Sequence, residues 1–156
     1  MKAELFSRDA QEFLRVLAKH DVRYVVIGGI AVIYHGYARL TGDIDFLFDR
    51  SPANVPRLWA ALLEFWGGTV PALSSADELL DPNIVVQFGR PPNRIDLIAD
   101  LGPVKFEEAW DKRVAERITL DGLTVPVWIL GLSELRRSKV EAGRPKDLDD
   151  LEHLPG

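Results

Sequence analysis

The chain has 156 residues, 47% hydrophobic and 28% charged, which is typical of one globular domain with a substantial core, expected here over residues 1–156. It contains no cysteine, which excludes disulfides and thiolate chemistry, and its three histidines are too scattered for a His-rich zinc site. The net charge of −5 argues against a broad nucleic-acid-binding face. We expect a cytoplasmic protein with no membrane partner, because the N-terminus lacks a signal-peptide pattern and no apolar run approaches a membrane span.

The first elements lead to a glycine pair. Apolar residues at helical spacing predict an amphipathic helix that begins after Ser7; they are Ala10, Phe13, Leu14, Leu17 and Ala18. Residues 22–27 form a predicted buried strand, which runs into Gly28 and Gly29 and a buried helix over 30–35. Backbone amides lie bare at a helix start and the helix dipole adds positive charge, so the glycines predict a phosphate site.

A loop over residues 36–42 leads to the next apolar strand, which begins with Asp43 and Asp45. Two carboxylates at i and i+2 on a strand project from the same face, as a divalent metal requires. Asp43 alone could be a turn residue after Gly42. Asp45, however, lies inside an apolar strand, where burying a carboxylate needs compensation.

The middle of the chain supplies a third carboxylate. A helical stripe from Ser51 to Trp66 is followed by a long loop over 67–82, with one helical turn near 76–80, that we interpret as a lid for an acceptor. Strands over 84–88 and 94–99 should form a hairpin around residues 89–93. Asp96 lies inside an apolar strand as Asp45 does.

The last third is expected to hold a short helix over 105–112, a hairpin and a C-terminal helical segment. The hairpin strands, 115–120 and 123–130, flank an Asp-Gly turn, and Pro126 should place the second at an edge or bulge. The helical segment, 131–156, should contain a helix from Ser133 to Ala142 and another over 146–154.

The order of these motifs carries a resemblance. The apolar strand, Gly28-Gly29, spacer and Asp43-x-Asp45 resemble the nucleotidyltransferase superfamily related to DNA polymerase β. The run Arg39-x-Thr41-x-Asp43-x-Asp45 is similar to its small bacterial members. The block Lys139…Arg144-x-Lys146-Asp147-x-x-Asp150 is similar to bacterial AbiEii-toxin-related types. The resemblance implies an α+β fold, with a mixed β-sheet and helices packed mainly on one face.

The resemblance also implies an activity, namely transfer of a nucleoside monophosphate from a nucleoside triphosphate to an acceptor hydroxyl. Two Mg²⁺ ions, or Mn²⁺, would be held by three catalytic carboxylates, Asp43, Asp45 and Asp96. Nucleotide would be bound by Gly28, Gly29, Arg39, Thr41, Lys139 and Asp147. Many relatives have Ser where Gly29 stands, and its hydroxyl helps to hold the triphosphate. With only backbone here, we expect either a lower affinity for the triphosphate or a contact to it from Thr41 or Lys139. Lys146 is interpreted as part of a solvated basic face, together with Arg136 and Arg137.

The acceptor implied is a protein, an RNA end or a small molecule, and a toxin–antitoxin partner protein is a further candidate. The main alternative is a non-catalytic or weakly catalytic nucleotide-binding module, such as an antitoxin. A haloacid-dehalogenase phosphatase is disfavoured because its Asp-x-Asp ends a strand and is followed by Gly-Thr, whereas Phe46-Leu47 follow here. A sugar-nucleotide glycosyltransferase generally needs a longer chain.

Overall fold

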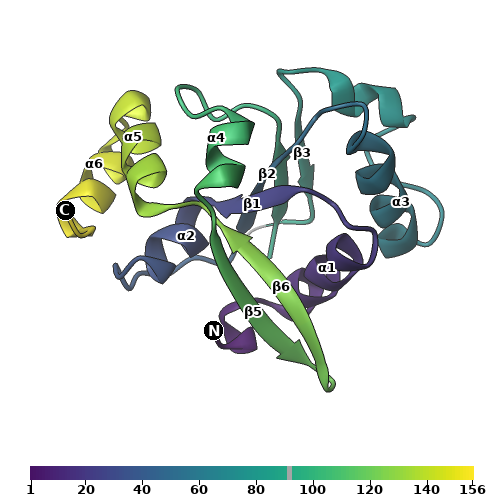
Figure 1. Ribbon diagram of the computed structural model, residues 1–156, viewed down its shortest axis with the longest axis horizontal. Coiled ribbons are helices and arrows are strands. Elements are labelled where there is room, and N and C mark those ends of the chain that lie inside the picture. Colours follow the sequence, from purple (N-terminus) through teal and green to yellow (C-terminus); the bar gives the residue numbers. More distant parts are fainter. Residues whose placement is uncertain (91–92) are drawn as a thin grey trace.

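The computed structural model describes residues 1–90 and 93–156 and confirms the expected α+β fold, a six-stranded mixed sheet with flanking helices (Figure 1). The strands are β1 (Tyr24–Ile27), β2 (Ile44–Phe48), β3 (Val85–Phe88), β4 (Ile95–Ile98), β5 (Val114–Leu120) and β6 (Leu123–Ile129). The α-helices are α1 (Arg8–Lys19), α2 (Gly28–Tyr34), α3 (Val55–Trp66), α4 (Phe106–Asp111), α5 (Leu132–Ala142) and α6 (Pro145–His153). Two short 3₁₀ helices, η1 (Ala3–Leu5) and η2 (Ala76–Leu80), complete the described elements.

The strand directions bring four chain segments to one end of the sheet. The order is β3-β4-β2-β1-β6-β5. Because β1 is antiparallel to β2 and parallel to β6, the ends of β1 and β6 lie at the same end of the sheet as the start of β2. Since β2 and β4 are parallel, the start of β4 lies there too. Both aspartate-bearing strands therefore begin where β1 passes into α2 and β6 leads to α5.

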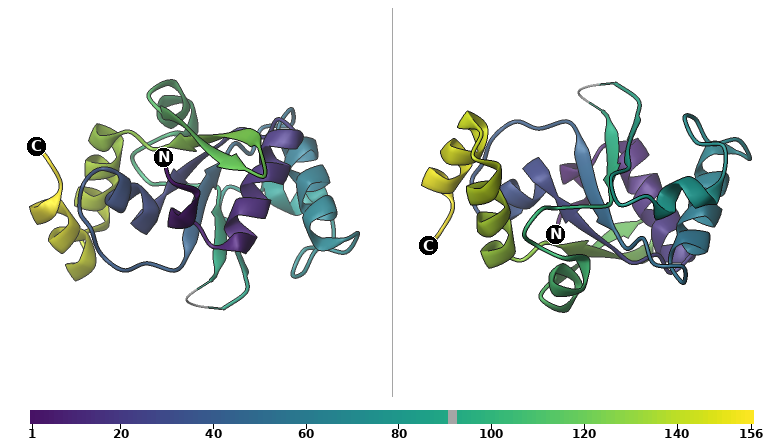
Figure 2. Two further views of the ribbon diagram at one scale, coloured as in Figure 1. Left: turned by 90° about the horizontal axis from the view of Figure 1, so that it is seen from below. Right: turned by 90° about the horizontal axis from the view of Figure 1, so that it is seen from above.

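The two faces of the sheet are covered differently (Figure 2). Helices α1 and α3 pack together over one face, where Phe13 of α1 lies against Phe46 of β2 with ring centroids 5.3 Å apart. On the opposite face α4 covers β1, and the Arg23 guanidinium lies 4.9 Å from the centre of the Trp110 ring. Alternation along β2 puts Asp45 on this second, less covered face.

The first helix and the turn within the long loop are confirmed as predicted. Ser7 caps α1 by accepting a hydrogen bond from the Ala10 amide at 3.1 Å. η2 occupies residues 76–80, and the described strands of the predicted hairpin, β3 and β4, pair antiparallel. Two residues of that hairpin's turn, 91 and 92, lie outside the described residues.

Some helix starts were predicted wrongly. α3 begins at Val55 rather than near Ser51, because Ser51 hydrogen bonds to the Asp49 carboxylate and the buried Asn54 amide donates to the Asp49 carbonyl at 2.7 Å. α5 begins at Leu132, after Gly131, so Ser133 lies inside the helix and does not cap it. The start of α3 is therefore set by the side-chain contacts of Asp49 and Asn54.

Pro126 is accommodated because β6 is only partly flanked. β6 pairs with β5 along its length, with Arg117 opposite Pro126, whereas its pairing with β1 joins only Val26 and Ile129. The missing amide of Pro126 therefore costs no bond to β1. The expected edge or bulge is therefore wrong: β6 lies between β1 and β5, and Pro126 is tolerated because the pairing with β1 does not extend to it.

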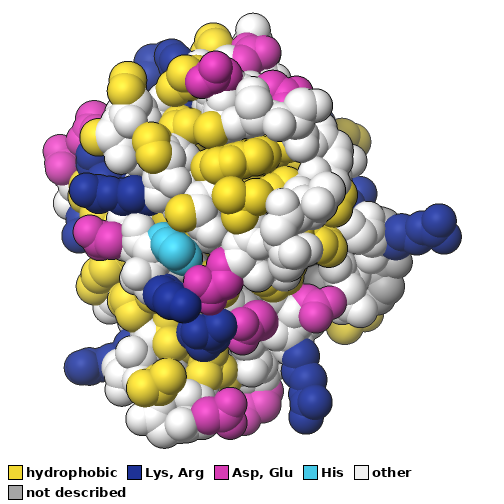
Figure 3. Space-filling view, turned by 90° about the vertical axis from the view of Figure 1, so that its right-hand side faces the viewer, with side chains coloured by type: hydrophobic (Ala, Val, Ile, Leu, Met, Phe, Trp, Pro, Cys, Tyr) yellow, Lys and Arg dark blue, Asp and Glu magenta, His cyan; other side chains and the backbone are white. Residues whose placement is uncertain are grey.

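Charges of both signs lie side by side on the side of the molecule where α3 is found (Figure 3). Glu64 of α3, for example, lies 2.9 Å from the Lys19 ammonium and 3.6 Å from the Arg15 guanidinium. This side therefore has no broad basic surface. No described helix combines the length and the apolar character that crossing a membrane requires.

Candidate active site

The turn from β1 to α2 requires glycine because the backbone touches side chains of the site. Gly28 has φ +65°, and a Cβ atom there would overlap the Asp45 carboxylate. A Cβ atom on Gly29 would lie 2.7 Å from the Thr41 hydroxyl oxygen. α2 starts at Gly28 itself, two residues earlier than predicted, so both glycine amides belong to its first turn.

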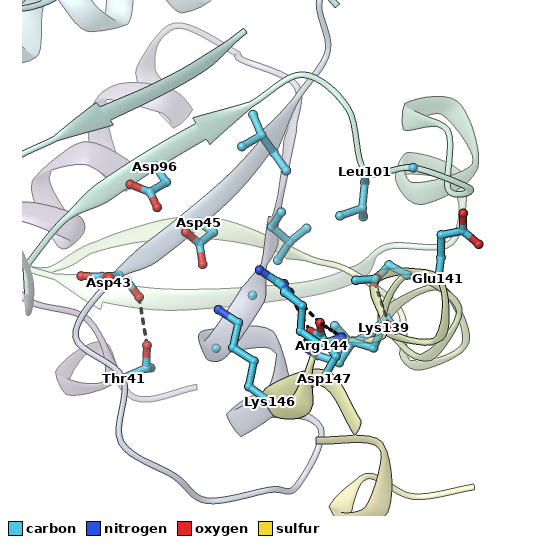
Figure 4. Close-up of a pocket in the computed structure, with 18 of the residues that line it drawn as sticks. Thr41, Asp43, Asp45, Asp96, Leu101, Lys139, Glu141, Arg144, Lys146 and Asp147 are labelled. Carbon is cyan, nitrogen blue, oxygen red and sulfur yellow. Dashed lines mark hydrogen bonds and ion pairs between the residues drawn. The ribbon is translucent and has the colours of Figure 1, made fainter. Parts of the chain in front are cut away.

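Asp45 and Asp96 are direct neighbours on adjacent strands. β2 and β4 pair in parallel with Asp45 opposite Asp96, so the two side chains project from the same face of the sheet. Gln87 of β3 continues this row beyond Asp96. Asp96 is 7% exposed, and Figure 4 shows it next to Asp45 at one side of the pocket.

Arg94 holds two of the three aspartates. Its guanidinium donates to both Asp96 carboxylate oxygens, at 2.8 and 3.1 Å, and lies 3.4 Å from Asp43. The Arg94 backbone amide also donates to the Asp43 carboxylate at 3.1 Å. The Asp43 side chain is therefore turned towards the start of β4.

Negative charge is crowded around Asp45. Burial raises the pKa of Asp45 to about 7, and the neighbouring Asp96 carboxylate and the charge of Asp43 act in the same direction, with Arg94 opposing them. A carboxylate with this environment is stabilised in its charged form by any additional cation. The site is therefore short of positive charge.

These residues fit a divalent metal, because their donors are carboxylate oxygens and Asp45 lacks a sufficient counter-charge. The carboxylate oxygens of Asp43, Asp45 and Asp96 do not all lie within 4.8 Å of one another. Among the described residues, only one group of three acidic or histidine side chains meets that distance, and it is the exposed group Asp149, Glu152 and His153. For all three carboxylates to share ions, Asp43 must rotate and Arg94 must release it.

The opposite wall of the pocket is a buried ion-pair network between α5 and α6. Lys139 is 7% exposed, and its ammonium lies 3.2 Å from Asp147 and 2.8 Å from Asp150. Arg39 makes two hydrogen bonds to Asp150, at 2.9 and 3.1 Å. Burial would raise the pKa of Asp147, but Arg144 and Lys139 outweigh it and hold the pKa below its ordinary value.

All of the predicted site residues line one pocket of about 600 Å³, within the range of small-ligand sites. They are Gly28, Gly29, Arg39, Thr41, Asp43, Asp45, Asp96, Lys139 and Asp147. The glycine turn and the aspartates form one side, and α5 and α6 form the other (Figure 4). The pocket thus joins the two sequence blocks that carried the resemblance.

A family model described as "Nucleotidyltransferase of unknown function (DUF6036)" matches residues 4–154. The chain belongs to this family. The match spans both the glycine–aspartate block and the C-terminal block, which agrees with the pocket being built from both.

A protein of known crystal structure has the same fold as this chain. A Thermotoga maritima protein provisionally called a nucleotidyltransferase, with a crystal structure at 1.87 Å, is similar over 97% of this chain and 93% of its own, with a TM-score of 0.55. The two sequences are 17% identical, so this likeness shows a shared fold. A comparison with the curated proteins finds no match.

Sequence reasoning missed several pocket residues of this DUF6036 family member. Arg94 shares a strand face with Asp96, and that alternation alone could have indicated its ion pair. Lys146 was interpreted as a solvated surface residue, but it lines the pocket. Gln87 had no usable signal, because its position beside Asp96 depends on the register between β3 and β4.

Proposed function

We propose that this protein is a metal-dependent nucleotidyltransferase, which moves a nucleoside monophosphate from a nucleoside triphosphate to an acceptor hydroxyl. The observation that carries the proposal is the Asp45–Asp96 pair, which lies on one sheet face beside Gly28, in the same pocket as the ion-pair network of α5 and α6. Family membership supports this reaction class.

In the proposed reaction the acceptor oxygen forms a bond to the α-phosphorus, the bond from that phosphorus to the β-phosphate oxygen breaks, and pyrophosphate leaves. Asp43, Asp45 and Asp96 would hold two Mg²⁺ ions, which Mn²⁺ could replace. When bound, such ions offset the charge that builds up on the attacking and leaving oxygens. Asp96 would accept the acceptor's proton as general base once Arg94 releases it.

The phosphates would bind at the glycine turn. The Gly28 and Gly29 amides belong to the first turn of α2, where the helix itself offers them no carbonyl partner, and neither residue has a side chain that would keep a phosphate away. The Thr41 hydroxyl occupies the space that a side chain on residue 29 would enter. This position supports the proposal that Thr41 supplies the hydroxyl that a serine provides in many relatives.

The finer assignments are also proposals. Similarity of residues 139–150 to AbiEii-toxin-related proteins supports a place in a toxin–antitoxin pair, with a protein, an RNA end or a small molecule as acceptor. The alternative, a nucleotide-binding module without catalysis, would keep the pocket but transfer nothing.

We expect nucleotide and metal together to stabilise the protein. With Mg²⁺ present and a nucleoside triphosphate at about 100 times its Kd, linkage gives roughly 2.7 kcal/mol of additional unfolding free energy. Thermal unfolding with ATP, CTP, GTP and UTP, each with Mg²⁺ and with EDTA, measures this. An unchanged melting temperature in all eight conditions would contradict the proposal, and metal-dependent stabilisation without transfer to any acceptor would favour the binding module.

A further inference from the structure

Lys146 differs from the other cations that line the pocket. Arg39, Arg94, Lys139 and Arg144 each form ion pairs with aspartates. Within residues 1–90 and 93–156, Lys146 makes neither a hydrogen bond nor an ion pair, although it lines the same pocket. Its positive charge is therefore available to a ligand.

The backbone of Lys146 is held firmly. Pro145 opens α6, and the next residue after Lys146, Asp147, is 1% exposed and bonded to Lys139 and Arg144. Because successive helical side chains point in different directions, the contact of Asp147 with α5 leaves Lys146 directed elsewhere. Figure 4 shows its side chain reaching into the pocket, on the side of the aspartates.

Lys139, by contrast, already has two buried ion-pair partners in the protein. Its ammonium is nearly buried and contacts two carboxylates that are each 1% exposed. Moving it to a phosphate would leave Asp147 and Asp150 with less counter-charge in a buried place, which is costly. Lys146 can bind a phosphate without this cost, because it leaves no hydrogen-bond or ion-pair partner among residues 1–90 and 93–156.

We propose that the Lys146 ammonium binds the β- and γ-phosphates of the triphosphate from the side opposite the glycine turn and, after transfer, the leaving pyrophosphate, while Lys139 is a positioning residue that fixes α6 against α5. This inference rests on the proposed function and identifies the ligand of one side chain within it. A lysine ammonium is a compact charge on a flexible stem, suited to phosphate oxygens at the mouth of a pocket. Arg144, whose side chain is 60% exposed, stands next to it and adds positive charge.

Calorimetric titration with inorganic tripolyphosphate and Mg²⁺ tests the proposal without choosing a base. We expect Lys146→Ala to weaken the apparent Kd roughly tenfold to a hundredfold, the usual effect of losing a hydrogen bond to a charged group. Lys146→Arg should recover most of the affinity. Lys2→Ala, which removes an exposed lysine outside the pocket, serves as the matched control and should bind as the wild type does.

The melting temperature without ligand distinguishes an effect on binding from an effect on folding. Lys146→Ala should have the melting temperature of the wild type, because the Lys146 side chain is exposed and makes no hydrogen bond or ion pair within residues 1–90 and 93–156. Wild-type affinity in Lys146→Ala would overturn this inference and leave the proposed function intact. A wild type that binds neither tripolyphosphate nor any of the four nucleoside triphosphates would overturn both.

A labelling experiment gives independent evidence. Pyridoxal phosphate followed by borohydride attaches to lysines close to a phosphate site, and we expect peptide mapping to find Lys146 modified and protected by tripolyphosphate. If the extent of labelling at Lys146 is the same with and without tripolyphosphate, the result argues against the proposal.

Discussion

Asp45→Asn is expected to lower nucleotidyl transfer by at least about a thousandfold, since it removes a proposed metal ligand whose charge contribution is worth several kcal/mol in the transition state. Asn keeps the shape of Asp45 and its place between Gly28 and Asp96. The measurement is single-turnover release of pyrophosphate with Mg²⁺ and an acceptor that the wild type uses. Asp111→Asn, an exposed carboxylate at the end of α4, is the control.

The same variant should fold more stably than the wild type at high pH when divalent ions are removed. The folded-state pKa of Asp45 is raised to about 7, so between about pH 4 and 7 the folded protein retains a proton that the unfolded chain has lost. Stability contributed by that proton is therefore lost progressively between about pH 4 and pH 7. Asn is free of this loss, so the variant's advantage should be absent near pH 4, grow as pH rises and reach its full size above pH 7; the difference between pKa values of about 4 and about 7 corresponds to about 4 kcal/mol. A less stable variant at pH 8 would mean that lost activity reflects lost structure.

Lys139→Ala is expected to destabilise the protein by about 3–5 kcal/mol, because it leaves Asp147 and Asp150 buried without their shared ammonium. Urea unfolding followed by circular dichroism measures the change, evaluated at constant m-value. Detachment of α6 from α5 should appear first, as faster amide exchange in α6.

The matched comparison is Lys19→Ala. Lys19 is 57% exposed and pairs with Glu64 on the surface at 2.9 Å, so its loss should cost less than about 1 kcal/mol. If both substitutions lower the unfolding free energy by the same small amount, the ion-pair network between α5 and α6 does not support the fold. Lys139 would then again be a candidate for a direct phosphate ligand.

Local patterns were sufficient for the site's main residues because the chemistry lies within short segments. Gly28-Gly29 follows an apolar strand, and Asp45 and Asp96 each interrupt one, so their positions could be predicted before the strands were paired. The pairing itself could not be predicted from spacing. Only the parallel register of β2 and β4 shows that Asp45 and Asp96 are direct neighbours.

The remaining features depend on contacts between distant segments. Lys146 resembles any solvated lysine in the sequence, and only the placing of α6 by the bonds of Asp147 turns it into the pocket. The side-chain amide of Asn54 donates hydrogen bonds to the carbonyls of Arg23 and Asp49. These bonds to other segments place the start of α3 after Asn54, and the local sequence gives no sign of them. Arg94 was visible in the pattern, but its role as the present counter-ion of Asp43 and Asp96 depends on rotamers.

The most direct test of the account is diffraction from crystals grown with Mn²⁺ and a non-hydrolysable triphosphate, with data collected at a wavelength where manganese scatters anomalously. We expect anomalous peaks between Asp45 and Asp96, with Asp43 rotated towards them and Arg94 displaced from its present bonds. Anomalous density confined to the exposed cluster of Asp149, Glu152 and His153, with Arg94 still bound to Asp96, would contradict it.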